Sequence, residues 1–89
     1  MKLYVSKKAL KQLENLEERD KEAIKARLKE LALSFEEGYL PKMDLKKLKG
    51  KMSGYYRLRV GDFRVILTLD WKDGSVLVHE IQRRRSAYK

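Results

Sequence analysis

The chain opens with alternating polar and apolar residues and then changes to a helical period. KLYVS, from Lys2 to Ser6, alternates in this way and is rich in strand-forming side chains, so we predict a short first strand. Ser6 is suited to cap a helix, because its hydroxyl can accept a hydrogen bond from a backbone N–H of the first turn. Leucines then recur every three residues at Leu10, Leu13 and Leu16, which indicates an amphipathic helix.

A second amphipathic helix is predicted to follow. We place its start near residues 15–18, because Asn15 and Glu18 have the spacing of a capping box. Gly38 suits its C-terminal cap. The apolar residues of this helix form one stripe opposite its charged residues: Ile24, Leu28, Leu31 and Phe35. We expect the two helices to form an antiparallel hairpin whose apolar stripes belong to the core.

The next segment, YLPKMDLKKLKGKMSG from Tyr39 to Gly54, has no clear period. It contains the only proline, two glycines and five lysines. We interpret it as a basic connector with room for one helical turn. Leu40, Leu45 and Leu48 are expected to anchor it to the core.

From Tyr55 the period becomes two and predicts a β-hairpin that turns at Gly61-Asp62. This turn sets Arg59 directly opposite Arg64. The apolar side chains then share the core face: Leu58, Val60, Phe63, Val65, Leu67 and Leu69. The other face receives Arg57, Arg59, Arg64, Ile66 and Thr68.

A second turn signal, Lys72 to Ser75, precedes a last predicted strand from Val76 to Ile81. A loop of two or three residues is expected there, and its length decides which faces His79 and Glu80 occupy. The predicted order of strand, helix, helix and three strands is typical of an α+β two-layer sandwich. We therefore expect helices on one face of a mainly antiparallel four-stranded sheet, within a single domain spanning residues 1–89.

Composition narrows the possible functions. The 89 residues include no cysteine and one histidine, which excludes disulfides, thiolate metal sites and an imidazole cluster, so we expect no cofactor. No apolar run has the length of a membrane span or of a signal-peptide core, so a soluble cytoplasmic protein is expected.

The net charge of +9 is concentrated in the second part of the chain. Residues 1–38 carry nine basic and eight acidic side chains, a net charge of +1, whereas residues 39–89 carry thirteen and five, a net charge of +8. A basic excess confined to one part of a small domain is typical of proteins that bind a polyanion such as nucleic acid. A basic but merely soluble surface is the alternative.

The arginines of the predicted hairpin suggest where such an anion binds. Like charges placed directly opposite each other destabilise a sheet, and a bound phosphate relieves that repulsion. Alternatively, the side chains are solvated and partly neutralised by Asp62 or Glu80. The C-terminal IQRRRSAYK, from Ile81 to Lys89, adds three arginines and a tyrosine beside the hairpin, expected to reach the same face. Phosphate-binding arginines near an aromatic ring favour single-stranded RNA.

Three blocks carry a resemblance to a known family: LKKLKG (Leu45 to Gly50), YYRLRVGDFRVI (Tyr55 to Ile66) and RRRSAY (Arg83 to Tyr88). With the helical hairpin before them, they make the chain resemble the RelE branch of the RelE/ParE toxins of bacterial and archaeal toxin-antitoxin systems. The arginine-tyrosine ending is more typical of this ribonuclease branch than of the gyrase-inhibiting ParE branch.

The resemblance implies a ribosome-dependent endoribonuclease, which cleaves mRNA in the decoding site through attack of a ribose 2′-hydroxyl. It also implies a small acidic, RelB-like antitoxin as partner, besides the ribosome and mRNA. The family's catalytic positions are matched by Arg57, Arg59, Arg64, Arg84 and Tyr88, with Arg83 a near alternative to Arg84. Further basic residues are expected to hold the RNA: Lys47, Lys49, Lys51, Arg83 and Arg85.

One departure from the family leaves the general base open. The best-known member has lysines where this chain has Arg57 and Arg59, and arginine stays protonated, so these two are expected to clamp charge. Candidate bases are Tyr88, Glu80, Lys49 and Lys51. His79, Trp71 and Phe63 are interpreted as structural residues. A ParE-like inhibitor of a DNA topoisomerase and an inactive RNA-binding homologue remain the alternative functions.

Overall fold

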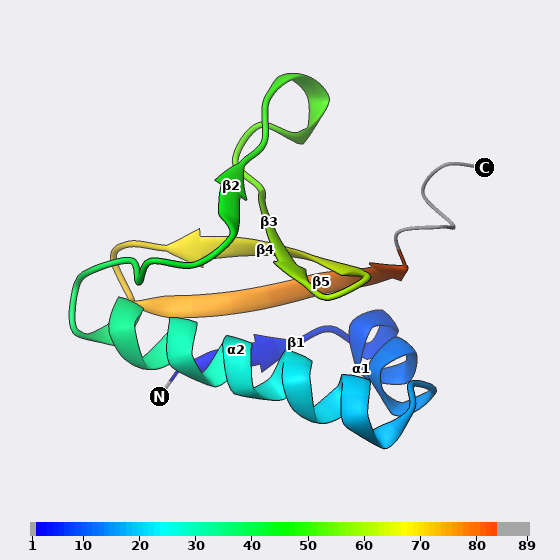
Figure 1. The fold of residues 1–89 in the computed structure, drawn as a ribbon. Coiled ribbons are helices and arrows are strands. Elements are labelled where there is room, and N and C mark those ends of the chain that lie inside the picture. The colour runs from blue at the N-terminus through cyan, green and yellow to red at the C-terminus, as the bar shows by residue number, and fades with distance from the viewer. Residues whose placement is uncertain (1, 84–89) are drawn as a thin grey trace.

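The computed structural model describes residues 2–83, which form five strands, two α-helices and one short 3-10 helix. In chain order the elements are β1 (Leu3–Val5), α1 (Lys7–Glu14), α2 (Glu18–Glu36), β2 (Leu45–Lys47), η1 (Gly50–Met52), β3 (Tyr56–Val60), β4 (Phe63–Asp70) and β5 (Ser75–Arg83). The strands make one sheet in the order β1-β5-β4-β3-β2, with both helices on one side (Figure 1). The α+β two-layer prediction is confirmed.

The sheet has five strands, so the prediction of four was wrong. The strand that we missed, β2, pairs antiparallel with β3 at the sheet's edge. It is only three residues long and includes two lysines, a composition that protects an exposed edge and conceals the strand signal. The meander β2-β3-β4-β5 is antiparallel throughout, whereas β1 pairs in parallel with β5.

The helix boundaries follow local capping chemistry. Ser6 caps α1 as predicted, because its Oγ accepts a hydrogen bond from the Ala9 N–H at 3.1 Å. The predicted capping box at Asn15 was wrong: Asn15 ends α1, and α2 begins after Glu17, which makes no side-chain cap. At the other end of α2, Gly38 has φ +97, which lets the chain leave the helix as predicted.

The core lies between α2, α1 and the inner face of the sheet. The predicted α2 stripe is buried throughout, as are Leu58, Phe63, Val65 and Leu67 of the hairpin. In the connector, Leu45 and the unpredicted Met43 pack against this core, whereas Leu40 is 37% exposed and was wrongly taken as an anchor. Among the described residues, no helix is long and apolar enough to cross a membrane.

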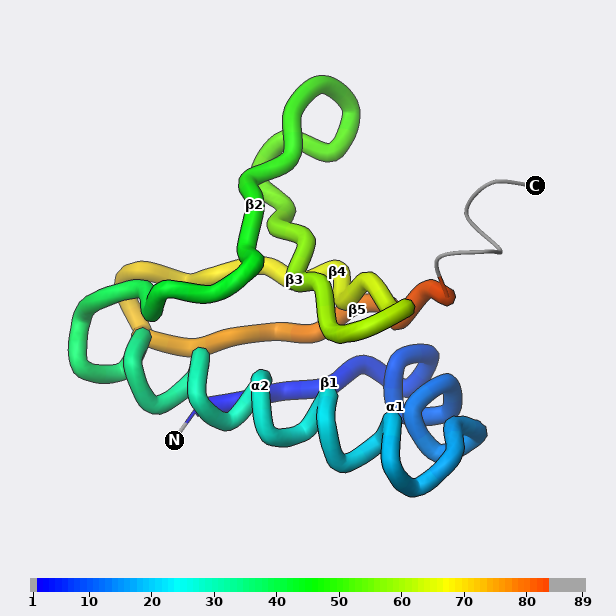
Figure 2. The backbone as a smooth tube through the Cα atoms, viewed as in Figure 1, coloured from blue at the N-terminus to red at the C-terminus, as the bar shows by residue number. Residues whose placement is uncertain are grey.

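The β3–β4 hairpin has the predicted register. Val60 pairs with Phe63 and Arg59 with Arg64 across the Gly61-Asp62 turn. Gly61 has φ +59 and Asp62 does not have a positive φ, which fits a two-residue type II′ turn. Strand β2 flanks β3 on the side away from β4. Together with the loop that contains η1, it projects away from the helical layer (Figure 2).

The β4–β5 connection differs from the prediction. Asp70 pairs with Ser75, so the loop has four residues, Trp71 to Gly74, and β5 continues to Arg83. The register then shifts at Ile66/Leu67: Leu67 pairs with Val78 and Ile66 with Glu80. This bulge adds His79 to β5, so His79 and Glu80 leave the core side while Ile81 returns to it.

Candidate functional site

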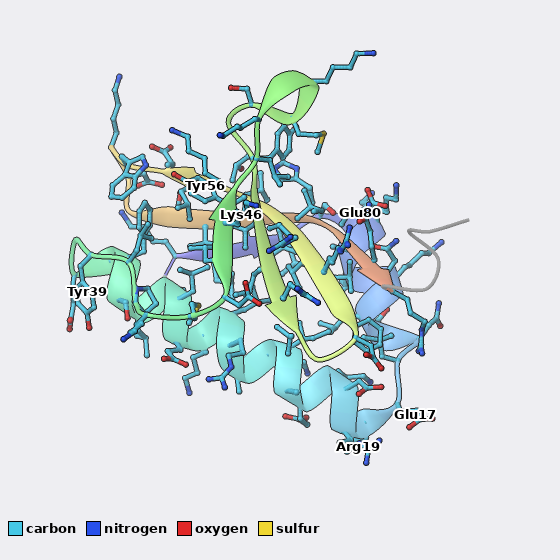
Figure 3. The ribbon with its side chains drawn as sticks, turned by 45° about the horizontal axis from the view of Figure 1, so that its top comes forward. Glu17, Arg19, Tyr39, Lys46, Tyr56 and Glu80 are labelled. Carbon is cyan, nitrogen blue, oxygen red and sulfur yellow. The ribbon has the colours of Figure 1, made fainter. Side chains whose placement is uncertain are left out.

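The sheet face turned away from the helices carries the predicted arginines, and we call it the open face. Strand alternation and register place these residues on it: Tyr4, Lys46, Arg57, Arg59, Arg64, Ile66, Thr68, Leu77, Glu80 and Gln82. Tyr55 and His79 join them through ring and hydrogen-bond contacts described below. Figure 3 shows Lys46 and Glu80 on strands to either side of the β3–β4 hairpin.

Three arginines occupy the middle of the open face. Arg59 and Arg64 are directly paired across β3 and β4, and Arg57 pairs with Ile66 one step along the same face. The Arg57 side chain is only 20% exposed and that of Arg59 35%. Ile66, the partner of Arg57, is buried on this face and does not belong to the main core. Its side chain gives the arginine stems an apolar surface to pack on.

Asp44 is the acidic residue beside this cluster, and sequence analysis did not single it out. Its carboxylate lies 3.5 Å from Nη2 of Arg57 and 3.9 Å from Nε of Arg59. The proposed neutralising residue Glu80 is instead paired with Lys8, at 3.5 Å. Asp44 comes just before the unpredicted strand β2, and the pairing of β2 with β3 is what brings its carboxylate beside the arginines. Without that pairing, its position could not be predicted from the sequence.

The connector lysines do not all lie on the open face. Lys46 pairs with Arg57 and shares its face, whereas the predicted RNA-binding residue Lys47 pairs with Tyr56 and points to the other side. Alternation along β2 could have assigned Lys46 to the cluster if that strand had been recognised. Lys49 and Lys51 are exposed in and beside η1, on the projecting loop.

The C-terminal arginines were predicted to reach the arginine cluster, and this was wrong for Arg83. Arg83 pairs with Phe63, a core-face residue, and its guanidinium carbon lies 4.8 Å from the centre of the Phe63 ring. A cation–π contact therefore holds it on the helical side of the sheet. The remaining candidates, Arg84, Arg85 and Tyr88, lie outside the described residues.

Three side chains of the open face form a cluster next to the arginines. Nε2 of His79 and Oγ1 of Thr68 share a hydrogen bond of 2.9 Å. The Tyr55 ring meets the His79 ring edge to face, with 5.1 Å between centres. Phe63 is in the core as predicted, and Trp71 packs edge-on against Phe35 at 4.6 Å.

Helix α1 fixes the bulge that carries His79. Strand β1 pairs with β5 only as far as Val78, so the outer edge of β5 needs other partners beyond that point. Ser6 Oγ donates to the His79 carbonyl at 2.8 Å, and the Ile81 N–H donates to Oε1 of Gln12 at 2.7 Å. The open face is thus positioned by side chains of the helical layer.

Two helices packed on one face of a five-stranded, mainly antiparallel sheet make a RelE-like fold, and sequence comparison agrees. Residues 3–88 match the family model described as ParE toxin of type II toxin-antitoxin systems. The chain therefore belongs to the RelE/ParE family of type II toxin-antitoxin toxins. It is 38% identical over 65 residues, 71% of each chain, to RelE1 of Methanocaldococcus jannaschii, a candidate toxin.

Solved structures give the same result. The chain matches a RelB–RelE antitoxin–toxin complex from Methanococcus jannaschii with a TM-score of 0.74 and 26% identity, over 96% of this chain and 94% of that one. It matches an archaeal RelE–RelB complex from Pyrococcus horikoshii with a TM-score of 0.73 and 28% identity, over 93% of each. The isolated RelE toxin of E. coli, 23% identical with a TM-score of 0.71 over 92% and 82%, shares the fold.

Proposed function

We propose that this toxin is an mRNA endoribonuclease that acts on the ribosome and inhibits translation by cleaving mRNA in the decoding site. In the proposed reaction a ribose 2′-hydroxyl attacks the adjacent phosphate and the 5′-oxygen leaves. The products are a 2′,3′-cyclic phosphate and a 5′-hydroxyl end. The observation that supports this most directly is the arginine cluster on the open face of a RelE-like sheet.

Arg57, Arg59 and Arg64 serve as the phosphate clamp in this proposal. Guanidinium groups give bidentate, permanently charged donors to phosphate oxygens, and the charge on those oxygens grows as the 2′-hydroxyl attacks. Nε of Arg57 is buried and makes no hydrogen bond within the described residues. Leaving such a donor without a partner costs about 1–3 kcal/mol, and a phosphate oxygen bound by Arg57 would supply one.

Proton transfer requires groups other than these arginines. Glu80 lies on the open face, diagonally across from Arg64, and is the candidate base that the register brings nearest to the clamp. Lys49 and Lys51, on the projecting loop, remain candidates for contacting the RNA strand. Following the family resemblance, we assign Arg84 to the phosphate clamp. We assign Tyr88 to protonation of the leaving 5′-oxygen.

A small acidic antitoxin is the proposed partner. The M. jannaschii and P. horikoshii relatives were solved with RelB. In this chain a groove of about 520 Å³ runs between α2 and β3. Its apolar lining includes Ala23, Ala26, Met43, Leu58 and Val60, and its charged lining is Arg27, Lys42, Asp44 and Arg59, three cations and one anion. An amphipathic acidic segment complements such a groove. Co-expression with the adjacent reading frame should yield a complex, and recovery of free toxin alone contradicts this partner.

Replacing Arg64 with alanine separates function from stability. The change removes the like-charge pair with Arg59, so any loss of stability of Arg64→Ala in urea unfolding should stay well below that of a core deletion. Its mRNA cleavage on programmed ribosomes should fall by about 10²-fold or more, the range for loss of one transition-state donor. Arg27→Ala, on the helical layer, is the matched control and should keep full activity. Destabilisation comparable to a core deletion would show that Arg64 is structural.

A second candidate function follows from the matched family model, which is that of the ParE toxins. By resemblance to that branch, the chain would inhibit a DNA topoisomerase without chemistry. Adding purified toxin to a supercoiling assay and to a translating ribosome assay discriminates the two. Inhibition of the topoisomerase without mRNA cleavage supports the ParE-like function.

A further inference from the structure

The proposed cleavage chemistry leaves Tyr55, Thr68 and His79 without a role. Tyr55 precedes Arg57 by two residues, and Thr68 follows Ile66, the partner of Arg57, by two. Two residues along a strand span about 7 Å, so this ring cluster lies one row beyond the arginines on the same face. None of the three residues belongs to the hydrophobic core cluster, so core packing does not account for them.

The orientation of the His79 ring is fixed before any ligand arrives. Its Nε2 is held by a hydrogen bond of 2.9 Å to Thr68 Oγ1. The Tyr55 ring packs against it in a T-shaped contact with 5.1 Å between ring centres. The backbone at His79 is held as well, because Ser6 Oγ donates to its carbonyl at 2.8 Å. The bulge that adds His79 to β5 turns this ring toward the open face. A partly exposed pair of rings held by these contacts is therefore preorganised for a flat ligand.

We propose that Tyr55 and His79 form a stacking subsite for one nucleobase of single-stranded RNA, next to the phosphate held by Arg57, Arg59 and Arg64. This inference rests on the proposed ribonuclease function and adds a subsite to it. Tyrosine and histidine rings stack on unpaired bases, and a neighbouring guanidinium holds the backbone that presents the base. Thr68 is a positioning residue, since it acts by orienting His79.

Binding of a short single-stranded RNA at fixed low ionic strength tests the subsite. Tyr55→Ala should weaken binding about 5- to 150-fold, the range for loss of one base–aromatic stack. Tyr55→Phe should bind as the wild type does, because the ring is kept. Tyr39→Ala is the matched control, since Tyr39 is an exposed tyrosine just beyond α2.

Abasic substitution, scanned one position at a time through the same RNA, supplies a measurement that needs no protein variant. Wild-type binding should weaken at one position, and at that position Tyr55→Ala should cause no further loss. Thr68→Val should likewise reduce the affinity for intact RNA but not for that abasic RNA. The salt dependence should stay unchanged in Tyr55→Ala, whereas Arg64→Ala should lower the slope of log K against log salt concentration by about 0.7.

Two results overturn the subsite: Tyr55→Ala binding intact RNA as tightly as the wild type, or an abasic scan without any sensitive position. Failure of the proposed function gives a different pattern. RNA that binds with the predicted abasic signature but is not cleaved on ribosomes refutes the ribonuclease and leaves the subsite standing. A wild-type protein that binds no RNA refutes both.

Discussion

At the residue scale, the identity of a few charged side chains determines what the open face can do. Arg57 and Arg59 stand where the family resemblance leads one to expect lysines, so the open face presents planar guanidinium groups, which suit bidentate binding of phosphate. The Asp44 carboxylate lies beside both arginines and is 57% exposed. An exposed carboxylate at these distances contributes about 1 kcal/mol or less to stability. We infer that Asp44 mainly reduces the positive charge offered to RNA.

Replacing Asp44 with asparagine tests that role. Asp44→Asn should bind single-stranded RNA more tightly and with a steeper salt dependence, because one negative charge leaves the phosphate site. Its free energy of unfolding should change by about 1 kcal/mol or less. Glu30→Gln, which removes a 3.0 Å ion pair with Arg27 on α2, is the control and should leave RNA binding unchanged. Weaker RNA binding by Asp44→Asn contradicts this account.

A second residue-scale prediction concerns pH. Nζ of Lys2 lies 2.8 Å from Asp73, and this hydrogen bond raises the pKa of Lys2 and lowers the pKa of Asp73. Because the pKa of Asp73 is depressed in the folded state, its contribution to stability is present at neutral pH and is lost as the pH falls through the folded value. Because the pKa of Lys2 is raised, its contribution is lost as the pH rises through the folded value.

Asp73→Asn should therefore melt at a lower temperature than the wild type at neutral pH, and the two melting curves should converge in strong acid. Lys2→Met should show the same convergence, since it removes the same pair. Thermal melts monitored by circular dichroism across the acid range measure this. A constant difference between Asp73→Asn and wild type at every pH contradicts the assignment.

At the element scale, the sequence predicted regular elements well and irregular ones poorly. The hairpin register follows from alternation around Gly61, and the confirmed Arg59–Arg64 pair is a direct consequence. Strand β2 was missed because a three-residue edge strand has too few side chains to show a period. The bulge at His79 was missed because one added residue leaves the composition of a strand unchanged, and its partners come from α1. Non-local contacts of this kind have no signature in a local pattern.

The bulge should depend on Gln12. Its Oε1 accepts the Ile81 N–H at 2.7 Å, so Gln12→Ala leaves a part-buried donor without that partner. The free energy of unfolding should fall by about 1–3 kcal/mol. Gln12→Glu keeps an acceptor at the same position and should be affected less. Equal stability of both variants and the wild type in urea unfolding would show that the contact does not hold the bulge.

At the scale of the whole molecule, the helical layer and the open face of the sheet have different roles. The helical layer buries the apolar face of the sheet and fixes the edge of β5, while the open face brings Arg57, Arg59 and Arg64 together. The proposed antitoxin groove between α2 and β3 includes Arg59 of the arginine cluster, so we expect an acidic segment bound there to weaken RNA binding at the open face. Such competition gives a simple physical basis for silencing a toxin by its antitoxin.

The most direct test of the central claim is analysis of RNA ends after incubating the toxin with mRNA on programmed ribosomes. We predict cleavage within the decoding site, with a 2′,3′-cyclic phosphate on the upstream fragment and a 5′-hydroxyl on the downstream fragment. Naked mRNA should be cut far more slowly. Intact mRNA on ribosomes, or fragments that carry a 5′-phosphate, would contradict the proposed ribonuclease mechanism.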